Sequence, residues 1–315
     1  MHNKKIALLE DLPADKIKEL KKVASDYELV DSLEGNHLED IEIVFGWNEE
    51  VKDFVESDQS QLKWIQSVWA GVDSLPLELL NQKGIDLTSG SGTNAHAVAE
   101  STMAMISSIG RQIVTSVREQ EKKNWFVSEK DYELKGKEIL IVGAGKIGEN
   151  IGRLAQAFLM KTVGVNRSGS KVNYMDEQYL QDELGNIIHK ADIIVNVLPA
   201  TIETENLFDQ NLFQKMKETA IFVNVGRGES VVMDDLMAAL DKKEISWAAL
   251  DVFEEEPLAS DHPLWNYGNV LITPHIAGQV ENQLDYLFPI FLDNLKAYLA
   301  GKDFPHNKID WEQGY

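Results

Sequence analysis

At 315 residues the chain is long for a single domain, so about two domains are expected. Its formal net charge of −22 disfavours nucleic acid and anionic membrane surfaces as partners, because both would repel the protein. The sequence has no cysteine, which excludes disulfide bonds, thiolate metal sites and a thiol nucleophile, and no metal ion is expected.

The amino-terminal apolar run, residues 6–9, is too short for a signal peptide. No stretch of the sequence approaches the roughly 18 uninterrupted apolar residues of a membrane span. We therefore expect a soluble cytoplasmic protein.

Short apolar segments alternate with helical patterns over the first hundred residues. Such alternation predicts an α/β domain with a parallel sheet. The predicted strands are residues 6–9, 27–30, 41–45, 62–68 and 85–88.

The loop at residues 69–73 follows one of these strands, and ligands in open α/β sheets sit at this carboxyl edge. The backbone N–H groups of Ala70, Gly71 and Val72 could therefore bind a carboxylate. The alternative interpretation of this loop is an ordinary turn.

A long helix is predicted over residues 95–121, with Asn94 as its capping residue. An aromatic segment, residues 124–127, follows it, with Tyr132 and Leu134 shortly beyond. Apolar side chains on such an arm suggest a dimer contact. Packing within the chain is the alternative.

A glycine-rich turn stands at the centre of the sequence, between an apolar strand at residues 139–142 and a helical pattern. Gly143, Gly145 and Gly148 give the spacing G-x-G-x-x-G in the strand–turn–helix context of a dinucleotide fingerprint. The helix start would supply N–H groups to the phosphates. An ordinary glycine-rich turn is the alternative. The predicted cofactor contacts here are Gly143, Ala144, Gly145, Lys146, Ile147 and Gly148.

The next predicted strand, residues 162–165, ends where NAD-binding folds usually place an acidic residue for the ribose hydroxyls. Asn166 stands there instead, followed by Arg167 and Ser168, with Lys171 nearby. Arg167 could bind a 2′-phosphate, so the sequence favours NADP(H) over NAD(H). The alternative is that Arg167 is a solvated surface charge.

Four further strands are predicted at residues 192–197, 220–225, 246–252 and 270–273, and a final helix at residues 281–300. Arg227, Glu256 and His275 lie in loops that follow three of these strands, so they could converge at one sheet edge. An arginine fork suits the carboxylate and carbonyl oxygen of a 2-oxo acid, and histidine can donate a proton near neutral pH. Glu256 would orient the imidazole. Taken singly, each could be an ordinary surface residue.

Several segments resemble the D-isomer-specific 2-hydroxyacid dehydrogenases. They are residues 97–100, 142–148, 224–228, 250–257, 262–265 and 273–278. The resemblance implies that Arg227 binds substrate, that His275 is the acid/base and that Glu256 is its partner. It also implies that residues 70–72 hold the substrate carboxylate and that Asp251 holds the nicotinamide carboxamide. The other positions expected to line the cofactor are Thr102, Leu198, Pro199, Val225, Gly226 and Gly278.

The same resemblance implies a fold of two Rossmann-like, doubly wound parallel-sheet domains. The substrate domain would be flavodoxin-like and discontinuous, formed by residues 1–97 and 283–315. The dinucleotide-binding domain would be residues 98–282, and the protein would be a homodimer.

Within this family, the stretch from Asn166 to Ser168 is similar to NADPH-dependent glyoxylate/hydroxypyruvate reductases. The predicted activity is hydride transfer from NADPH to a small anionic 2-oxo acid, which gives the D-2-hydroxy acid, with His275 as acid/base. One alternative is an NAD-dependent dehydrogenase of the D-lactate or phosphoglycerate type. Another is a non-catalytic nucleotide sensor like the corepressors of the family.

Overall fold

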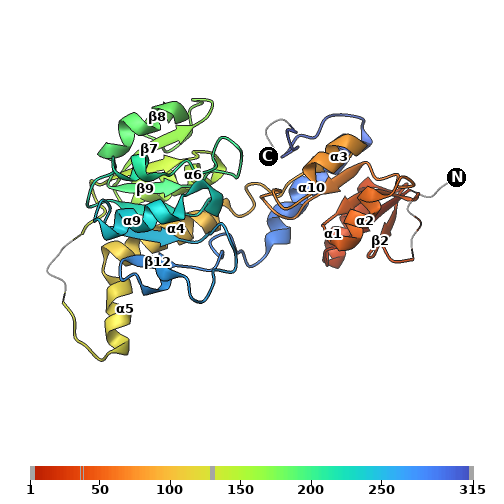
Figure 1. The fold of residues 1–315 in the computed structure, drawn as a ribbon. Coiled ribbons are helices and arrows are strands. Elements are labelled where there is room, and N and C mark those ends of the chain that lie inside the picture. The colour runs from red at the N-terminus through yellow and green to blue at the C-terminus, as the bar shows by residue number, and fades with distance from the viewer. Residues whose placement is uncertain (1–3, 36, 38, 128–131, 312–315) are drawn as a thin grey trace. The chain divides into compact units, whose positions relative to one another are not determined.

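The computed structural model describes residues 4–35, 37, 39–127 and 132–311 (Figure 1). The chain divides into two compact units. Unit 1 is Met1–Thr93 with Val280–Tyr315, and unit 2 is Asn94–Gln279. Within the described ranges, no helix combines the length and the apolar character needed to cross a bilayer.

Unit 1 is built on a five-stranded parallel sheet in the order β2-β1-β3-β4-β5, the flavodoxin-like order. One face packs against α2 and α3, and the other against α1 and α10, so the sheet is doubly wound as predicted. Its strands are β1 (Lys5–Leu8), β2 (Glu28–Val30), β3 (Ile41–Phe45), β4 (Trp64–Gln66) and β5 (Asp86–Thr88). Its helices are α1 (Ala14–Val23), α2 (Glu49–Glu56), α3 (Leu77–Lys83) and α10 (Gln283–Leu299).

A buried polar network attaches the returning helix α10 to this sheet. The indole N–H of Trp64 donates to Thr88 Oγ1 (2.9 Å), and that hydroxyl donates to Gln66 Oε1 (2.8 Å). Asn294 donates to the same Gln66 oxygen (3.3 Å) and to the His306 carbonyl (3.0 Å), and it accepts from His306 N (3.1 Å). Because Gln66, Thr88 and Asn294 are fully buried, these bonds are not exchanged for water, and they fix the position of α10.

Replacing Asn294 by alanine is expected to destabilise unit 1 by about 1–3 kcal/mol, because buried groups of Gln66 and His306 lose their partner. Hydrogen–deuterium exchange should show faster exchange in α10 and β4. The matched control is Asn282→Ala, since Asn282 is exposed at the start of α10 and makes no capping bond. Equal protection in the two variants would contradict the proposed role of the network.

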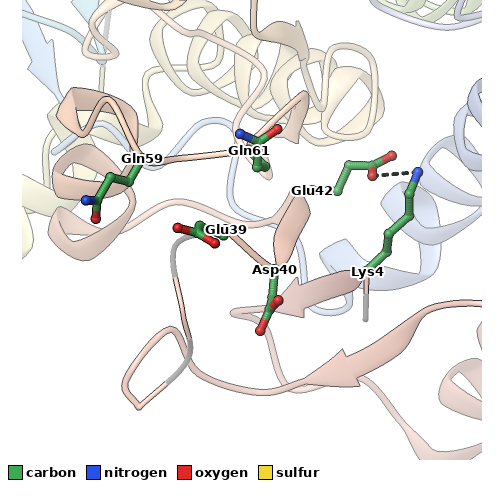
Figure 2. Close-up of a pocket in the computed structure, with 6 residues that line it drawn as sticks. All are labelled: Lys4, Glu39, Asp40, Glu42, Gln59 and Gln61. Carbon is green, nitrogen blue, oxygen red and sulfur yellow. Dashed lines mark ion pairs between the residues drawn. The ribbon is translucent and has the colours of Figure 1, made fainter. Parts of the chain in front are cut away.

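A pocket in unit 1 lies at the amino-terminal edge of the sheet, and Figure 2 shows the carboxylates that dominate it. Lys4 Nζ lies 2.8 Å from Glu42 Oε2. Although burial opposes ionisation, hydrogen bonds from Lys4, Tyr27 and Tyr298 lower the pKa of Glu42. This negative pocket does not suit the small organic acid expected from the sequence. Its lining residues are Lys4, Glu39, Asp40, Glu42, Gln59 and Gln61.

Unit 2 is built on a seven-stranded parallel sheet in the order β12-β11-β10-β9-β6-β7-β8. The order reverses between β6 and β9, which is the Rossmann arrangement with one strand added. The strands are β6 (Glu138–Val142), β7 (Lys161–Asn166), β8 (Glu177–Leu180), β9 (Ile193–Asn196), β10 (Ile221–Asn224), β11 (Trp247–Leu250) and β12 (Val270–Ile272). The α-helices are α4 (Ala95–Gly110), α5 (Ile113–Glu121), α6 (Lys146–Ala157), α7 (Leu184–Ile187), α8 (Gln210–Phe213) and α9 (Met233–Asp241).

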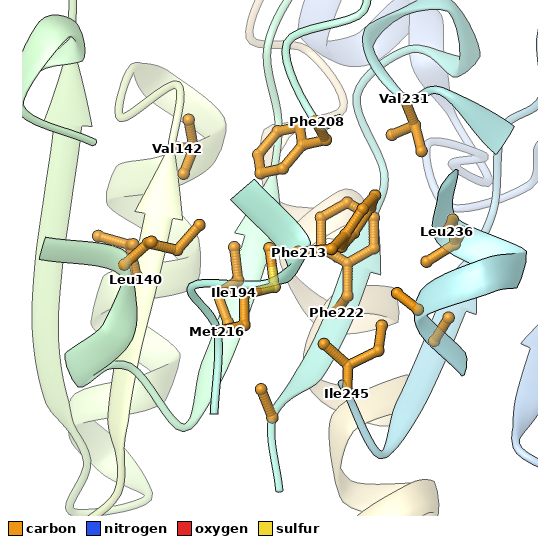
Figure 3. Close-up of a cluster of buried hydrophobic side chains, with 14 of the residues drawn as sticks. Leu140, Val142, Ile194, Phe208, Phe213, Met216, Phe222, Val231, Leu236 and Ile245 are labelled. Atoms are coloured by element: carbon orange, nitrogen blue, oxygen red, sulfur yellow. The ribbon is translucent and has the colours of Figure 1, made fainter. Parts of the chain in front are cut away.

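Both faces of this sheet are covered by apolar cores, because buried parallel strands are apolar on both sides. Residues of α4 and α6 cover one face. Residues of α7, α8 and α9 cover the other, where Figure 3 shows three neighbouring phenylalanine rings. The rings of Phe208 and Phe213 lie 5.0 and 5.4 Å from that of Phe222, centroid to centroid. The predicted fold class, two doubly wound parallel-sheet domains, is confirmed.

The prediction of a single long helix over residues 95–121 is wrong. The structure has two helices, α4 and α5, and Gln112 between them adopts a left-handed φ of 60°. After this break the Arg118 guanidinium donates to the carbonyls of Gly268, just before the edge strand β12, and of Val270, the first residue of that strand. A tertiary contact thus overrides a helical pattern that is continuous in the sequence.

Two other details differ from the predictions. The Asn94 side chain makes no capping bond to α4, and its Oδ1 is buried without a partner among the described residues. Strand β8 was not predicted, because its short polar sequence, Glu-Gln-Tyr-Leu, lies at the sheet edge and lacks an apolar run.

The residues that follow α5 were predicted either to form a dimer contact or to pack within the chain, and different residues fit each interpretation. Trp125 is 94% exposed and Val127 is 72% exposed, which leaves the dimer interpretation open for them. Leu134 is buried in the core of unit 2, and Tyr132 packs against Gly110 of α4, so these two residues pack within the chain. Residues 128–131 lie outside the described part of the chain.

Candidate active site

The glycine turn after β6 can exist only because its first residue has no side chain. Gly143 has a φ of 99°, and a Cβ there would lie 2.8 Å from the carbonyl carbon and oxygen of Val197. The turn is held by Gly143 N and Ala144 N, which both donate to the Val165 carbonyl (2.9 and 2.8 Å). Gly143 therefore packs the end of β6 closely against the loop after β9. At Gly145 a Cβ would meet nothing nearer than the Gly143 carbonyl oxygen at 4.0 Å, so the backbone is open to the close approach of a ligand there.

Helix α6 begins directly after this turn and presents its amino terminus to the same edge of the sheet. The N–H groups of Ile147 and Gly148 donate to no residue that the structure describes. Gly148 lets the helix approach β6, because its Cβ would lie 3.1 Å from the Ile141 side chain. Free N–H groups and the positive end of the helix dipole fit a pyrophosphate. Lys146, at the first position of α6, is exposed.

The loop after β7 lies beside the glycine turn. Asn166 Nδ2 donates to the Ser170 carbonyl (2.9 Å) and, at 3.5 Å, to the Ala144 carbonyl, so it ties this loop to the glycine turn. Asn166 Oδ1 is buried and has no partner within the described residues. An orphaned acceptor at this position fits a donor hydroxyl of a bound ribose. The side chains of Arg167, Ser168 and Lys171 are all exposed.

The loops after β9 and β10 supply the next predicted cofactor residues. Leu198 N donates to Asn196 Oδ1 (3.2 Å), and the Pro199 carbonyl accepts from Thr204 Oγ1 (2.6 Å). Val225 N donates to the Asn196 carbonyl (3.1 Å). The backbones of both loops are thus fixed, and Gly226 lies close to Leu198, where a Cβ would be 2.7 Å from the Leu198 carbonyl oxygen.

Arg227 follows β10, and its half-buried side chain donates from Nη1 to the Gly226 carbonyl (2.9 Å). The next residue, Gly228, lies against the loop that follows β11. A Cβ on Gly228 would be 1.9 Å from the carbonyl carbon of Phe253, so only glycine fits. The structure thereby brings the loop of Arg227 next to the loop that carries Glu256.

Glu256 and His275 are in direct contact. His275 Nδ1 lies 2.7 Å from Glu256 Oε2, and Glu256 Oε1 accepts from Phe253 N (2.9 Å). The carboxylate is therefore held between its own loop and the imidazole. His275 Nε2 has no partner in the described part of the chain, and the side chain is 52% exposed, so this nitrogen is accessible to a ligand.

His275 stands on a left-handed residue, with a φ of 53°, and Asp251 holds the turn around it. The Asp251 carboxylate accepts from Thr273 Oγ1 (2.6 Å), Ile276 N (3.0 Å) and Ala277 N (3.0 Å), and its carbonyl accepts from His275 N (2.8 Å). Asp251 is only 1% exposed. These contacts give Asp251 a role in fixing the His275 turn, and its contact with nicotinamide stays a prediction.

Two other predicted cofactor residues lie along α4 and the His275 turn. Thr102 is fully buried, and its hydroxyl donates to the Val98 carbonyl of its own helix (2.7 Å), which does not favour a contact with a cofactor. Gly278 lies against Asn94, because a Cβ there would be 2.6 Å from Asn94 Nδ2. In this structure Thr102 bonds within α4, and Gly278 packs against the residue just before α4. The Ser101 hydroxyl of α4 also donates to the Ala277 carbonyl in the His275 turn (3.2 Å).

In unit 1 the predicted substrate loop follows β4. The N–H groups of Ala70, Gly71 and Val72 donate to no residue in the described ranges, while the Val72 carbonyl accepts from Leu75 N (2.9 Å). Three successive free N–H groups form a suitable environment for a carboxylate.

Two buried polar residues, Asn196 and Ser230, were not predicted from the sequence. They bond to the loops that carry Leu198 and Arg227. A signal for Asn196 is present in the sequence, since both β9 and β10 end in asparagine after an apolar run. Nothing in the sequence singles out Ser230. Among the described residues, no three His, Cys, Asp or Glu side chains come together as a possible metal site.

Comparisons with a family model and with known proteins indicate the same protein family. The family described as D-isomer specific 2-hydroxyacid dehydrogenase, NAD binding domain, matches residues 103–277, more than half of the chain. A glyoxylate/hydroxypyruvate reductase B of Escherichia coli (strain SMS-3-5 / SECEC) is 32% identical over 264 residues, with 82% of each chain covered.

Solved structures agree with this match. A D-isomer specific 2-hydroxyacid dehydrogenase family protein from Aeromonas salmonicida subsp. salmonicida A449 is 32% identical, with a TM-score of 0.81 and coverage of 98% of this chain and 99% of that one. An acyclic imino acid reductase solved with NADPH and D-Arg is 25% identical, with a TM-score of 0.80 and coverage of 97% and 100%. With the fold and the glycine turn described above, these matches show that the chain belongs to the D-isomer-specific 2-hydroxyacid dehydrogenase family of NAD(P)-dependent oxidoreductases.

Proposed function

We propose that this oxidoreductase reduces a small 2-oxo acid of the glyoxylate or hydroxypyruvate type to the D-2-hydroxy acid, with NADPH as the preferred cofactor. The observation that carries the proposal is the contact between His275 Nδ1 and Glu256 Oε2 (2.7 Å), beside the loop of Arg227. The name of the Escherichia coli relative, glyoxylate/hydroxypyruvate reductase B, supports the choice of substrate.

In the proposed mechanism, His275 is the proton donor. Glu256 accepts a hydrogen bond from the Nδ1–H group, orients the ring and stabilises the imidazolium, so that Nε2–H points away from the carboxylate. Arg227 binds the carboxylate and carbonyl oxygen of the substrate through its two-pronged guanidinium. When bound, the reduced nicotinamide supplies the hydride that adds to the carbonyl carbon. The carbonyl oxygen then takes the proton from His275 Nε2, which leaves a neutral imidazole and a 2-hydroxy acid.

The residues that would hold the cofactor lie along the carboxyl edge of the sheet in unit 2. Gly145, Ile147 and Gly148 would hold the pyrophosphate through the open backbone at Gly145 and the free N–H groups of Ile147 and Gly148. Asn166 Oδ1 would accept from a ribose hydroxyl. We therefore propose unit 2 as the dinucleotide-binding domain and unit 1, with the loop at residues 70–72, as the substrate domain.

Preference for NADPH is proposed because Asn166 replaces the usual acidic residue at the end of β7 and Arg167 follows it. Replacing Arg167 by alanine is expected to weaken NADPH binding about tenfold or more, because a charge-assisted bond to the 2′-phosphate is lost, and to leave NADH binding nearly unchanged. Fluorescence titration of both cofactors measures this. Arg153→Ala is the matched control, since Arg153 is an exposed arginine on α6. Equal NADPH affinity in wild type and Arg167→Ala would remove Arg167 from the proposal.

The proposed activity is tested by absorbance at 340 nm with glyoxylate, hydroxypyruvate and pyruvate, each with NADPH and with NADH. We expect turnover with NADPH and D-lactate as the product from pyruvate. Turnover with NADH alone would favour the NAD-dependent dehydrogenase. Cofactor binding without turnover of any acid would favour the nucleotide-sensing alternative.

The quaternary structure is also a proposal. Trp125, Phe126 and Val127, together with Ile113 and Val117 of α5, form an exposed apolar group on one segment of unit 2. Such a group suits the contact of a homodimer. Sedimentation of the wild type and of Trp125→Ser would measure the oligomeric state. A cytoplasmic location stays a prediction.

A further inference from the structure

Two neighbouring strands of unit 2, β9 and β10, both end in a buried asparagine. Asn196 and Asn224 are fully buried, and Ser230 beneath them is 1% exposed. Buried amides and hydroxyls need hydrogen-bond partners, because they are removed from water. The partners of these three side chains therefore show what the buried polar groups do.

The donors and acceptors among these side chains can all be assigned without conflict. Asn196 Nδ2 donates to Asn224 Oδ1 (2.9 Å) and to Ser230 Oγ (2.6 Å), which uses both of its hydrogens. The Ser230 hydroxyl accepts this bond, so its single hydrogen can donate to the Arg227 carbonyl (2.6 Å). Asn224 Nδ2 donates to the same carbonyl (3.0 Å). The Arg227 backbone is thus held by two buried donors.

The acceptor oxygens of the same asparagines hold the neighbouring loops. Asn196 Oδ1 accepts from Leu198 N (3.2 Å) in the loop after β9. Asn224 Oδ1 accepts from Gly226 N (3.1 Å), the residue before Arg227. One network therefore connects the loop proposed to line the cofactor with the loop proposed to bind the substrate.

We propose that Asn196, Asn224 and Ser230 are positioning residues that fix the backbone of Arg227, and that they link its placement to the cofactor loop after β9. This inference rests on the proposed function of Arg227 as the substrate-binding residue. Arg227 has an extended backbone, with φ −139° and ψ 146°. Its carbonyl is held by the donors of Asn224 and Ser230, and the next residue, Gly228, packs against the Phe253 backbone. The backbone that carries the guanidinium is therefore already ordered, so less conformational entropy is lost when Arg227 binds an oxo acid.

Ser230→Ala tests the proposal, because it removes one donor from the Arg227 carbonyl and leaves the side chain of Arg227 in place. We expect kcat/KM for glyoxylate to fall about five- to tenfold, mainly through a higher KM, with little change in the dissociation constant of NADPH. Ser230→Cys, which keeps a weaker donor and acceptor, should give a smaller fall. Thr162→Val is the matched control, since Thr162 has a fully buried hydroxyl at the opposite end of the sheet.

A double-mutant cycle with Arg227→Ala separates positioning from general stability. If Ser230 acts through Arg227, Ser230→Ala should have no further effect on kcat/KM when the guanidinium is absent. An equal fall in both backgrounds, or an equal fall in Thr162→Val, would overturn the inference and leave the proposed function intact. Full kcat/KM in Arg227→Ala would instead overturn the proposed function of Arg227, and this inference with it.

Discussion

His275→Ala is expected to lower kcat for glyoxylate reduction about 10²- to 10⁴-fold, the usual contribution of a general acid. The imidazole is held at Nδ1 by Glu256 and leaves Nε2 without a described partner, so its removal takes away the proposed proton donor. Binding of NADPH should change little, because the residues proposed to hold the pyrophosphate and the ribose lie in other loops. Steady-state kinetics and a fluorescence titration of NADPH measure the two quantities separately.

The matched control for this prediction is His189→Ala, since His189 is exposed on unit 2 outside the site. It should retain wild-type kcat. Glu256→Gln should reduce kcat less than His275→Ala, because the amide still accepts from Phe253 N but no longer stabilises the imidazolium. An unchanged kcat in His275→Ala would rule out its role as the acid/base.

Arg227→Ala is expected to lower kcat/KM for the oxo acid about 10²- to 10³-fold, the usual cost of removing a donor from a developing oxyanion. The loss should appear in both KM and kcat, because the guanidinium would bind the ground-state carboxylate and the carbonyl oxygen. Arg227→Lys keeps the charge and loses the planar fork, so it should recover only part of the activity.

The control for Arg227 is Arg111→Ala, because Arg111 is exposed at the end of α4 in the same unit. Titration of NADPH should show equal affinity in all three variants. A wild-type kcat/KM in Arg227→Ala would show that another group holds the substrate.

Much of the fold follows from the sequence, because buried parallel strands leave a strong local pattern. The apolar run before Gly143 predicts β6, and the glycine spacing predicts the turn and the start of α6. Edge elements carry a weaker pattern, which is why β8 was missed. The break at Gln112 could not be predicted, since it accompanies a contact of Arg118 with Val270 of β12, 152 residues away in the chain.

The sequence by itself determined the fold class and named candidate residues whose chemistry fits the proposed reaction, because histidine, arginine and glycine have properties that no other residue supplies. The tertiary structure decided which of them meet. The distance between Glu256 and His275, and the approach of Gly228 to Phe253, depend on how separate strands pair. It also decided that Asp251 fixes the His275 turn and that Thr102 is buried, because hydrogen-bond partners far apart in the chain leave no local signal.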